Sequence, residues 1–303
     1  MPNWSYCAKA CKRSVAKLEN QAILILCSIM GPSKGGELGL LSSVSKLRCD
    51  APEDEKLHLI GCHRVVSPAE TVDRIRPLMP RMGITRTADV TGLDRIGVPV
   101  VMVTRPNAKS LAVSQGKGLD LMAATASGLM ESVELFHAEH IELPLKLGSH
   151  RQLSQSHAMV DIDHLAHVHP QKFHDNLGML WIEGMDLFSG EPRWVPYETV
   201  RADFTFPAPP GSGCFDCSSN GLASGNSLIE AMCHGICEVI ERDATALWNQ
   251  SSNEAKSRTG LALDSVTDEF CLGVMQQLRD AEFDIAVWET TSDIAVASFF
   301  VLI

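Results

Sequence analysis

The sequence is short of basic residues. It holds 26 Lys and Arg against 37 Asp and Glu, which gives a formal net charge of -11. A broad basic surface for nucleic acid or anionic lipid is therefore not expected. An acidic chain can still bind phosphate groups locally, where a divalent cation or a focused cluster of donors offsets the overall field.

The sequence also lacks a membrane span and several common catalytic signatures. An apolar run at 22–30 follows basic residues as in a signal peptide, but it is too short to cross a bilayer and no small-residue cleavage site follows it. No Walker motif and no dinucleotide-binding G-x-G-x-x-G is present. We expect a cytoplasmic protein without a membrane segment.

Cysteine spacing gives no disulfide framework. The ten cysteines are scattered, which is typical of reduced thiols in a cytosol. Cys214 and Cys217 form the best zinc-like pair, but no second C-x-x-C follows at a suitable distance, so a structural zinc is not favoured. The histidine-rich segment 137–174 is interpreted as solvated loop residues in preference to a metal site.

Composition changes near residue 58. Residues 31–57 are rich in Gly, Ser and charge, so we expect a poorly defined N-terminal extension at 1–57 and one domain at 58–303. Helical and strand-like segments alternate, which predicts an α/β or α+β fold. The expected elements are a helix from Ser67 to Ile75, a turn and buried strand at 94–103, helices at about 119–140 and 226–249, strands near 177–186 and within 283–303, and a loop at 206–213.

An internal repeat is the most informative feature. Ser127-Gly-Leu-Met-Glu131-Ser-Val-Glu134 and His234-Gly-Ile-Cys-Glu238-Val-Ile-Glu241 share one pattern, 107 residues apart. Each copy follows a segment that we interpret as a glycine-containing turn, at 115–119 and 219–222. Duplication predicts that the two helices lie in equivalent environments.

Within each copy, the polar residues fall at i, i+4 and i+7 on one helical stripe, and the positions between them are mostly apolar. Glutamates in such surroundings are expected to be partly buried, and two like charges repel unless a cation lies between them. Four carboxylates converging from two helices would suit Mg²⁺. The alternative is an exposed acidic face on each helix, and Arg242 could be either an ion-pair partner or a phosphate donor.

Together with these repeats, several motifs resemble the YcaO family across about 58–303. They are Thr85-Arg86, Asp89-Val-Thr-Gly-Leu-Asp-Arg-Ile-Gly-Val-Pro-Val100, Ser114-Gln-Gly-Lys-Gly118, Asn220-Gly-Leu-Ala223 and Glu238-Val-Ile-Glu-Arg-Asp243. The resemblance implies a YcaO-type fold in which glutamate-bearing helices pack on β-sheet and bind ATP with Mg²⁺. It implies Glu131, Glu134, Glu238 and Glu241 as metal ligands, and Ser127, Arg242, Arg64, Thr71, Lys117 and Asn220 as nucleotide contacts. His234 departs from the glutamine of many members, and no residue is assigned a catalytic role beyond binding.

The family reaction, as the resemblance implies it, is ATP-dependent O-phosphorylation of a peptide amide. The products are an azoline, as made by a cyclodehydratase, or a thioamide. The implied partners are a peptide or protein substrate and a leader-binding or TfuA-type protein, and a homodimer is kept as an option. The alternative is a non-catalytic scaffold, or an accessory factor of a ribosomal-protein methylthiotransferase.

The C-terminal end of the chain departs from the family pattern. Family members continue further, whereas this chain ends at Ile303 within an apolar, strand-like segment. We therefore expect a YcaO-like domain that is incomplete at its C-terminal end. The prediction of enzymatic activity applies to the complete domain, and the activity of this chain by itself is left open.

Overall fold

The computed structural model describes residues 23–24, 27–28, 56–57, 61 and 63–303. The proposed extension at 1–57 and the apolar run at 22–30 lie outside the described residues, apart from the short segments just named. Two of these segments are strands, β1 (Ile23–Leu24) and β2 (Cys27–Ser28). The domain boundary near residue 58 stays a prediction.

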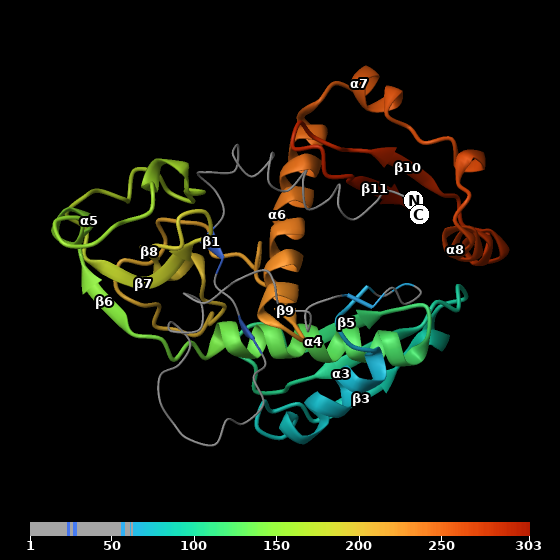
Figure 1. Ribbon diagram of the computed structural model, residues 1–303, viewed down its shortest axis with the longest axis horizontal. Helices are drawn as coiled ribbons and strands as arrows, with labels where there is room; N and C mark the ends of the chain where they lie inside the picture. Colours follow the sequence, from blue (N-terminus) through green and yellow to red (C-terminus); the bar gives the residue numbers. More distant parts are fainter. Residues whose placement is uncertain (1–22, 25–26, 29–55, 58–60, 62) are drawn as a thin grey trace.

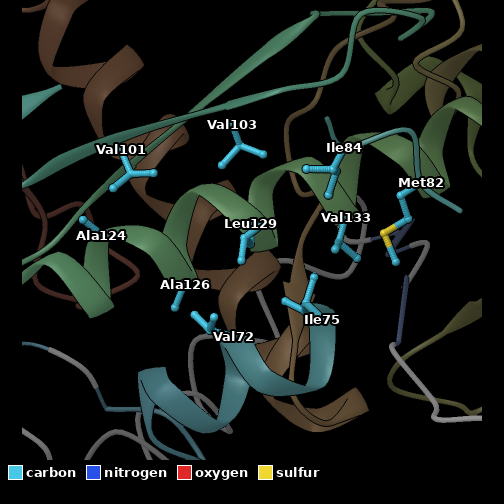
Figure 2. Packing of buried hydrophobic residues seen from close by; sticks show 10 residues of the cluster. All are labelled: Val72, Ile75, Met82, Ile84, Val101, Val103, Ala124, Ala126, Leu129 and Val133. Atoms are coloured by element: carbon cyan, nitrogen blue, oxygen red, sulfur yellow. The ribbon is translucent and has the colours of Figure 1, made fainter. Parts of the chain in front are cut away.

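The capping pattern at Ser67 begins a helix, as predicted. The hydroxyl oxygen of Ser67 accepts a hydrogen bond from the N–H of Glu70, and Pro68 occupies the first turn of α3 (Pro68–Ile75). A 3-10 turn, η3 (Arg76–Leu78), follows it. Val72 and Ile75 on the buried face of α3 pack into the first hydrophobic core (Figure 2).

Three antiparallel strands form the sheet beside this core. β3 (Arg86–Asp89) pairs with β4 (Val100–Thr104), and β4 pairs with β5 (Val113–Lys117). A 3-10 turn, η4 (Thr91–Leu93), joins the first two strands. Helix α4 (Leu121–Glu139) packs between this sheet and α3, and Figure 2 shows its Leu129 among strand and α3 side chains. The buried strand expected after a turn within 94–103 is thus confirmed as β4.

The glycine-rich segment before α4 differs from the prediction. We interpreted 115–119 as a turn, but Gln115, Gly116 and Lys117 continue β5, and Gly116 is buried opposite Val101. A Cβ on Gly116 would collide with the backbone of Ala124 and Gly128 in α4. Glycine is therefore used here to let a strand and a helix approach closely, which a turn interpretation missed.

A second sheet lies on the left of Figure 1. β7 (Met179–Asp186) pairs antiparallel with β6 (Leu145–Gly148), with β8 (Pro192–Pro196) and with β1. The short helices α5 (His150–Leu153), η5 (Ile162–His164) and η6 (Tyr197–Thr199) cover it. Its core is built around the buried Trp181 and Phe215. The segment 206–213 is a loop, as predicted, and the buried Glu198 carboxylate accepts N–H groups from Cys214 and Phe215 at the end of it.

Helix α6 (Leu228–Gln250) rises from the layer of α4 (Figure 1). It follows the turn at Asn220-Gly221 and the strand β9 (Ser224–Gly225), which pairs in parallel with β2. Beyond it come α7 (Asn253–Arg258), η7 (Leu263–Ser265), α8 (Glu269–Asp280) and the antiparallel pair β10 (Ala286–Glu289) and β11 (Phe299–Leu302). Trp248, Trp288 and Phe300 pack together where α6 meets this pair.

Helix and sheet are mixed throughout, which confirms the predicted fold class. Both glutamate-bearing helices end within two residues of the expected bounds. In the part of the chain that the structure describes, no helix is long and apolar enough to cross a bilayer.

Candidate functional site

The first glutamate pair is presented by α4. Asp120 caps the helix by accepting the N–H of Ala123, and the apolar side chains of Leu129 and Val133 bind the helix to the core. Glu131 lies at the edge of β5, where its Oε2 accepts the N–H of Gln115 at 3.0 Å. The strand therefore holds one carboxylate oxygen of Glu131 in place.

Glu134 is the most perturbed carboxylate of the site. The hydroxyl of Ser224 in β9 lies 3.4 Å from its Oε2 and 3.0 Å from the carbonyl oxygen of Met130. Burial, and then repulsion from Glu238, raises the pKa of Glu134 to about 8, with a smaller contribution from Glu131. A glutamate of α4 and a glutamate of α6 thus lie close enough to repel each other, and the carboxylate of Glu134 is poorly solvated.

The second glutamate pair is presented by α6, which begins at the cap Ser227. Glu238 is half-buried, and Arg242 donates from Nη2 to its Oε1 at 3.3 Å. Burial raises the pKa of Glu238 and so does Glu241, while Arg242 opposes the shift. The Arg242 side chain is 64% exposed, so the ion pair is a weak one. Glu241 is exposed one turn further along the helix.

These four glutamates interact as a chain of like charges that links the two helices, from Glu131 through Glu134 and Glu238 to Glu241. Carboxylate oxygens are the donors that Mg²⁺ prefers, and a cation between them would offset the repulsion. Among residues 56–57, 61 and 63–303, however, no three His, Cys, Asp or Glu side chains already form a metal-binding group. The fit to Mg²⁺ thus rests on donor chemistry and not on preformed coordination. Cys214 and Cys217 are free thiols.

Two of the expected nucleotide contacts gather at the start of α6. Arg64 lies with Nη1 3.6 Å from Oε1 of Glu230, and the buried Thr71 lies with Oγ1 3.1 Å from Oδ1 of Asn226. Arg64 also affects the neighbouring His234, whose pKa is lowered by burial and then by nearby positive charge. Arg64 and Thr71 therefore contact the same end of the helix that carries Glu238.

The remaining candidates are more dispersed. Ser127 is exposed on α4, one turn before Glu131. Lys117 ends β5, and Asn220 lies in the turn before β9, both with exposed side chains. Within the described ranges, no hydrogen bond or ion pair joins Lys117 or Asn220 to the four glutamates. Their assignment stays a prediction.

Glu230 is a buried carboxylate that the sequence interpretation missed. Its side chain is 1% exposed, and it accepts hydrogen bonds from the N–H of Val65 and from the N–H and side-chain amide of Asn226, besides its pairing with Arg64. The sequence did contain a pattern that points to Glu230, because Ser227-Leu-Ile-Glu230 matches a capping box. Glu230 organises the end of α6 where Arg64 and Thr71 lie.

The comparison with protein families agrees with this geometry. The model of the YcaO family, described as a cyclodehydratase that binds ATP and Mg²⁺, matches residues 115–303. The chain belongs to the YcaO family. The matched range contains both glutamate-bearing helices, and ATP and Mg²⁺ are the cofactors of this family.

This YcaO chain is similar to individual proteins and solved structures. An uncharacterised Rhizobium leguminosarum bv. trifolii protein, from the region 3′ of tfuA, is 36% identical over 79% of this chain and 56% of its own length. A structure of YcaO from Methanopyrus kandleri, bound with AMPPCP and Mg²⁺, is 24% identical to this chain and superimposes on it with a TM-score of 0.58. A heterocyclase in complex with substrate and cofactor is 23% identical, with a TM-score of 0.61. These structures cover 78% and 82% of this chain and 57% and 37% of their own, and they share its fold.

Proposed function

We propose that this YcaO chain holds Mg²⁺ with ATP between α4 and α6, and that it serves ATP-dependent activation of a peptide amide. Glu131, Glu134, Glu238 and Glu241 are the proposed metal ligands. Ser127, Arg242, Arg64, Thr71, Lys117 and Asn220 are the proposed nucleotide contacts. The chain spans little more than half the length of its curated relatives, so the activity of the whole protein is part of this proposal.

The observation that carries the proposal is the juxtaposition of Glu134 and Glu238. These two carboxylates come from distant parts of the sequence; burial raises the pKa of both, and repulsion from Glu238 raises the pKa of Glu134 further. Such an arrangement costs stability unless it serves to bind a cation. Bound Mg²⁺ would supply charge neutralisation for phosphate oxygens.

In the proposed reaction a nucleophile adds to a peptide amide carbonyl, ATP phosphorylates the resulting oxyanion and leaves as ADP, and phosphate is then eliminated. A Cys, Ser or Thr side chain as nucleophile gives an azoline, and external sulfide gives a thioamide. Phosphoryl transfer depends mainly on positioning and on charge stabilisation. The chain's own contributions would be the carboxylates that position the cation and the cations Arg64 and Arg242 that orient phosphate groups. Arg242 would exchange its contact with Glu238 for a phosphate oxygen.

We also propose a TfuA-type partner protein and a thioamide product as the finer assignment. The support is the relative from the region 3′ of tfuA, together with the Asp89-to-Val100 motif. A cytoplasmic location is proposed because Cys214, Cys217, Cys233, Cys237 and Cys271 form no disulfide.

The test separates nucleotide binding from turnover. We would measure ATP affinity by calorimetry with and without Mg²⁺, and ATP hydrolysis with and without candidate peptide. We expect Glu131→Ala and Glu238→Ala each to weaken Mg²⁺-dependent binding at least roughly tenfold, since a metal ligand is lost. Glu191→Ala, an exposed carboxylate in the loop before β8, is the matched control.

Each result has a defined meaning. Binding and turnover that both glutamate variants leave unchanged would refute the proposed site. Mg²⁺-dependent binding without turnover, even with peptide and partner present, would favour the scaffold or accessory role over the enzyme.

A further inference from the structure

Helix α6 carries two thiols beside its glutamates. Cys233 and Cys237 are one helical turn apart, so their side chains lie on the same face of the helix. Neither residue forms a disulfide, Cys233 is partly buried and Cys237 is exposed. This pair has no part in the proposed binding of Mg²⁺ or ATP.

A cation contacts the first of these thiols. The Lys56 ammonium lies with Nζ 3.7 Å from Sγ of Cys233, within hydrogen-bonding distance for sulfur. Arg64 adds nearby positive charge, although Glu230 pairs with it. An ammonium next to a thiol favours the thiolate, which is the nucleophilic form of cysteine.

The second thiol strengthens this effect. A side-chain hydrogen bond from Cys237 is the largest cause that lowers the pKa of Cys233 to about 6; burial opposes it, and the Lys56 and Arg64 charges add to it. The pKa of His234, the next residue, is lowered by desolvation and then by the Arg64 and Lys56 charges. At neutral pH, Cys233 is therefore largely ionised.

Other described cysteines lie in the opposite kind of environment. Burial raises the pKa of Cys214 and of Cys217, and nearby carboxylates add to the shift. Cys271 on α8 is exposed. Its pKa is nevertheless raised, by slight desolvation of the thiol and then by the Asp268 carboxylate. Exposure alone therefore does not distinguish Cys233, whereas its neighbouring cation and thiol do.

We propose that Cys233 is a site of covalent modification by thiol–disulfide exchange, in which Lys56 and Cys237 hold its thiolate form. The electrophile is the sulfur–sulfur bond of a low-molecular-weight disulfide. The Cys233 thiolate attacks one sulfur, a new bond forms between Sγ and that sulfur, and the other half leaves as a thiolate that takes a proton from water. One disulfide is consumed and one is formed, so no further oxidant is needed.

The test measures modification cysteine by cysteine. The full chain is treated with iodoacetamide from pH 5 to pH 9.5, and adducts on each cysteine are quantified by peptide mass spectrometry. We expect the Cys233 rate to reach its plateau by about pH 7, since thiolate formation is then nearly complete. The Cys271 rate should still rise above pH 9. Incubation with oxidised glutathione at pH 7 should place the mixed disulfide on Cys233 well ahead of Cys271.

Matched variants identify the cause. Lys56→Gln should slow Cys233 alkylation at pH 6.5 by roughly threefold, if its pKa rises by about one unit. Lys172→Gln, which removes a distant positive charge, should leave the rate unchanged. Cys237→Ala should slow Cys233 more than Cys237→Ser does, because serine retains a hydrogen-bond donor.

A Cys233 profile that rises in parallel with that of Cys271 up to pH 9 would overturn the proposal. So would equal glutathione adducts on the two residues in a chain that circular dichroism shows to be folded. Neither result depends on nucleotide or Mg²⁺, so the proposed function would stand or fall separately.

Discussion

Helices α4 and α6 carry the same glutamate pattern in very different surroundings. α4 is enclosed between α3 and the β3–β5 sheet, and its buried positions include the large residues Leu129, Val133 and Leu135. α6 buries mainly small residues such as Ala231, Gly235 and Ala244, and its own hydrophobic cluster centres on Ile240. Duplicated sequence has therefore not given equivalent environments.

The two glutamate pairs therefore lie in different environments. On α4, the rigid packing holds Glu131 against β5 and keeps Glu134 from water, which accounts for its large pKa shift. On α6, Glu238 has a cation one turn away in Arg242, and Glu241 is exposed. In the proposed site, α4 would therefore supply the most poorly solvated carboxylate and α6 the more exposed ones.

The largest expected effect concerns the core around α4. Leu129→Ala should lower the free energy of unfolding by about 3 kcal/mol, because it leaves a cavity at a side chain that is 1% exposed. Leu247→Ala on α6 should cost less than about 0.5 kcal/mol, since Leu247 is 50% exposed. Urea unfolding measures both. Similar losses for the two variants would contradict the contrast between the helices.

An intermediate effect concerns Glu134 and pH. Its folded-state pKa is raised to about 8 from 4.5, so the protonated carboxyl is the form that stabilises the fold. This contribution is fully present below about pH 4.5 and is lost as the pH rises through 8. Without Mg²⁺, Glu134→Gln should therefore raise the free energy of unfolding at pH 8, by on the order of 2 kcal/mol.

Urea unfolding at pH 5, 6.5 and 8 checks this prediction. The gain from Glu134→Gln should grow from the lowest pH to the highest, while Glu191→Gln in an exposed loop should show no such trend. A Glu134→Gln variant that is less stable at pH 8 than the parent protein would show that the carboxylate is not held in poorly solvated space.

The smallest expected effect concerns Arg242. Its ion pair with Glu238 is largely exposed, so Arg242→Gln should change the free energy of unfolding by less than about 1 kcal/mol. Removing the cation should nevertheless raise the pKa of Glu238 further, since Arg242 now opposes that shift. Calorimetric titration with Mg²⁺-ATP should show weaker binding in Arg242→Gln, together with unchanged stability. An unaltered affinity would leave Arg242 as an ion-pair partner only.

Much of the fold was predictable because it depends on local patterns. The capping pattern that starts at Ser67 predicted α3, and the helices expected at about 119–140 and 226–249 match α4 and α6 to within a few residues. The segment at 115–119 was wrongly interpreted as a turn. A glycine in a sequence can indicate either a turn or a position where another part of the backbone approaches closely. Only the packing of β5 on α4 shows that close approach is the reason for Gly116.

The site was predictable in part. The repeat singled out the glutamates, because acidic residues among apolar ones at helical spacing are unusual. It did not single out Glu230, whose capping-box position has an ordinary structural explanation, nor Ser224, whose hydroxyl contacts Glu134 only because β9 passes beside α4. Contacts between segments far apart in the chain have no periodic signature.

Residue spacing was sufficient to place the acidic side chains on one stripe of each helix, because helical geometry relates positions four and three apart in any surroundings. Only the assembled fold decided that Glu134 faces Glu238 while Glu241 remains in water. Solvation and repulsion depend on what packs around a side chain, and for α4 and α6 that is set by different sheets, strands and cores.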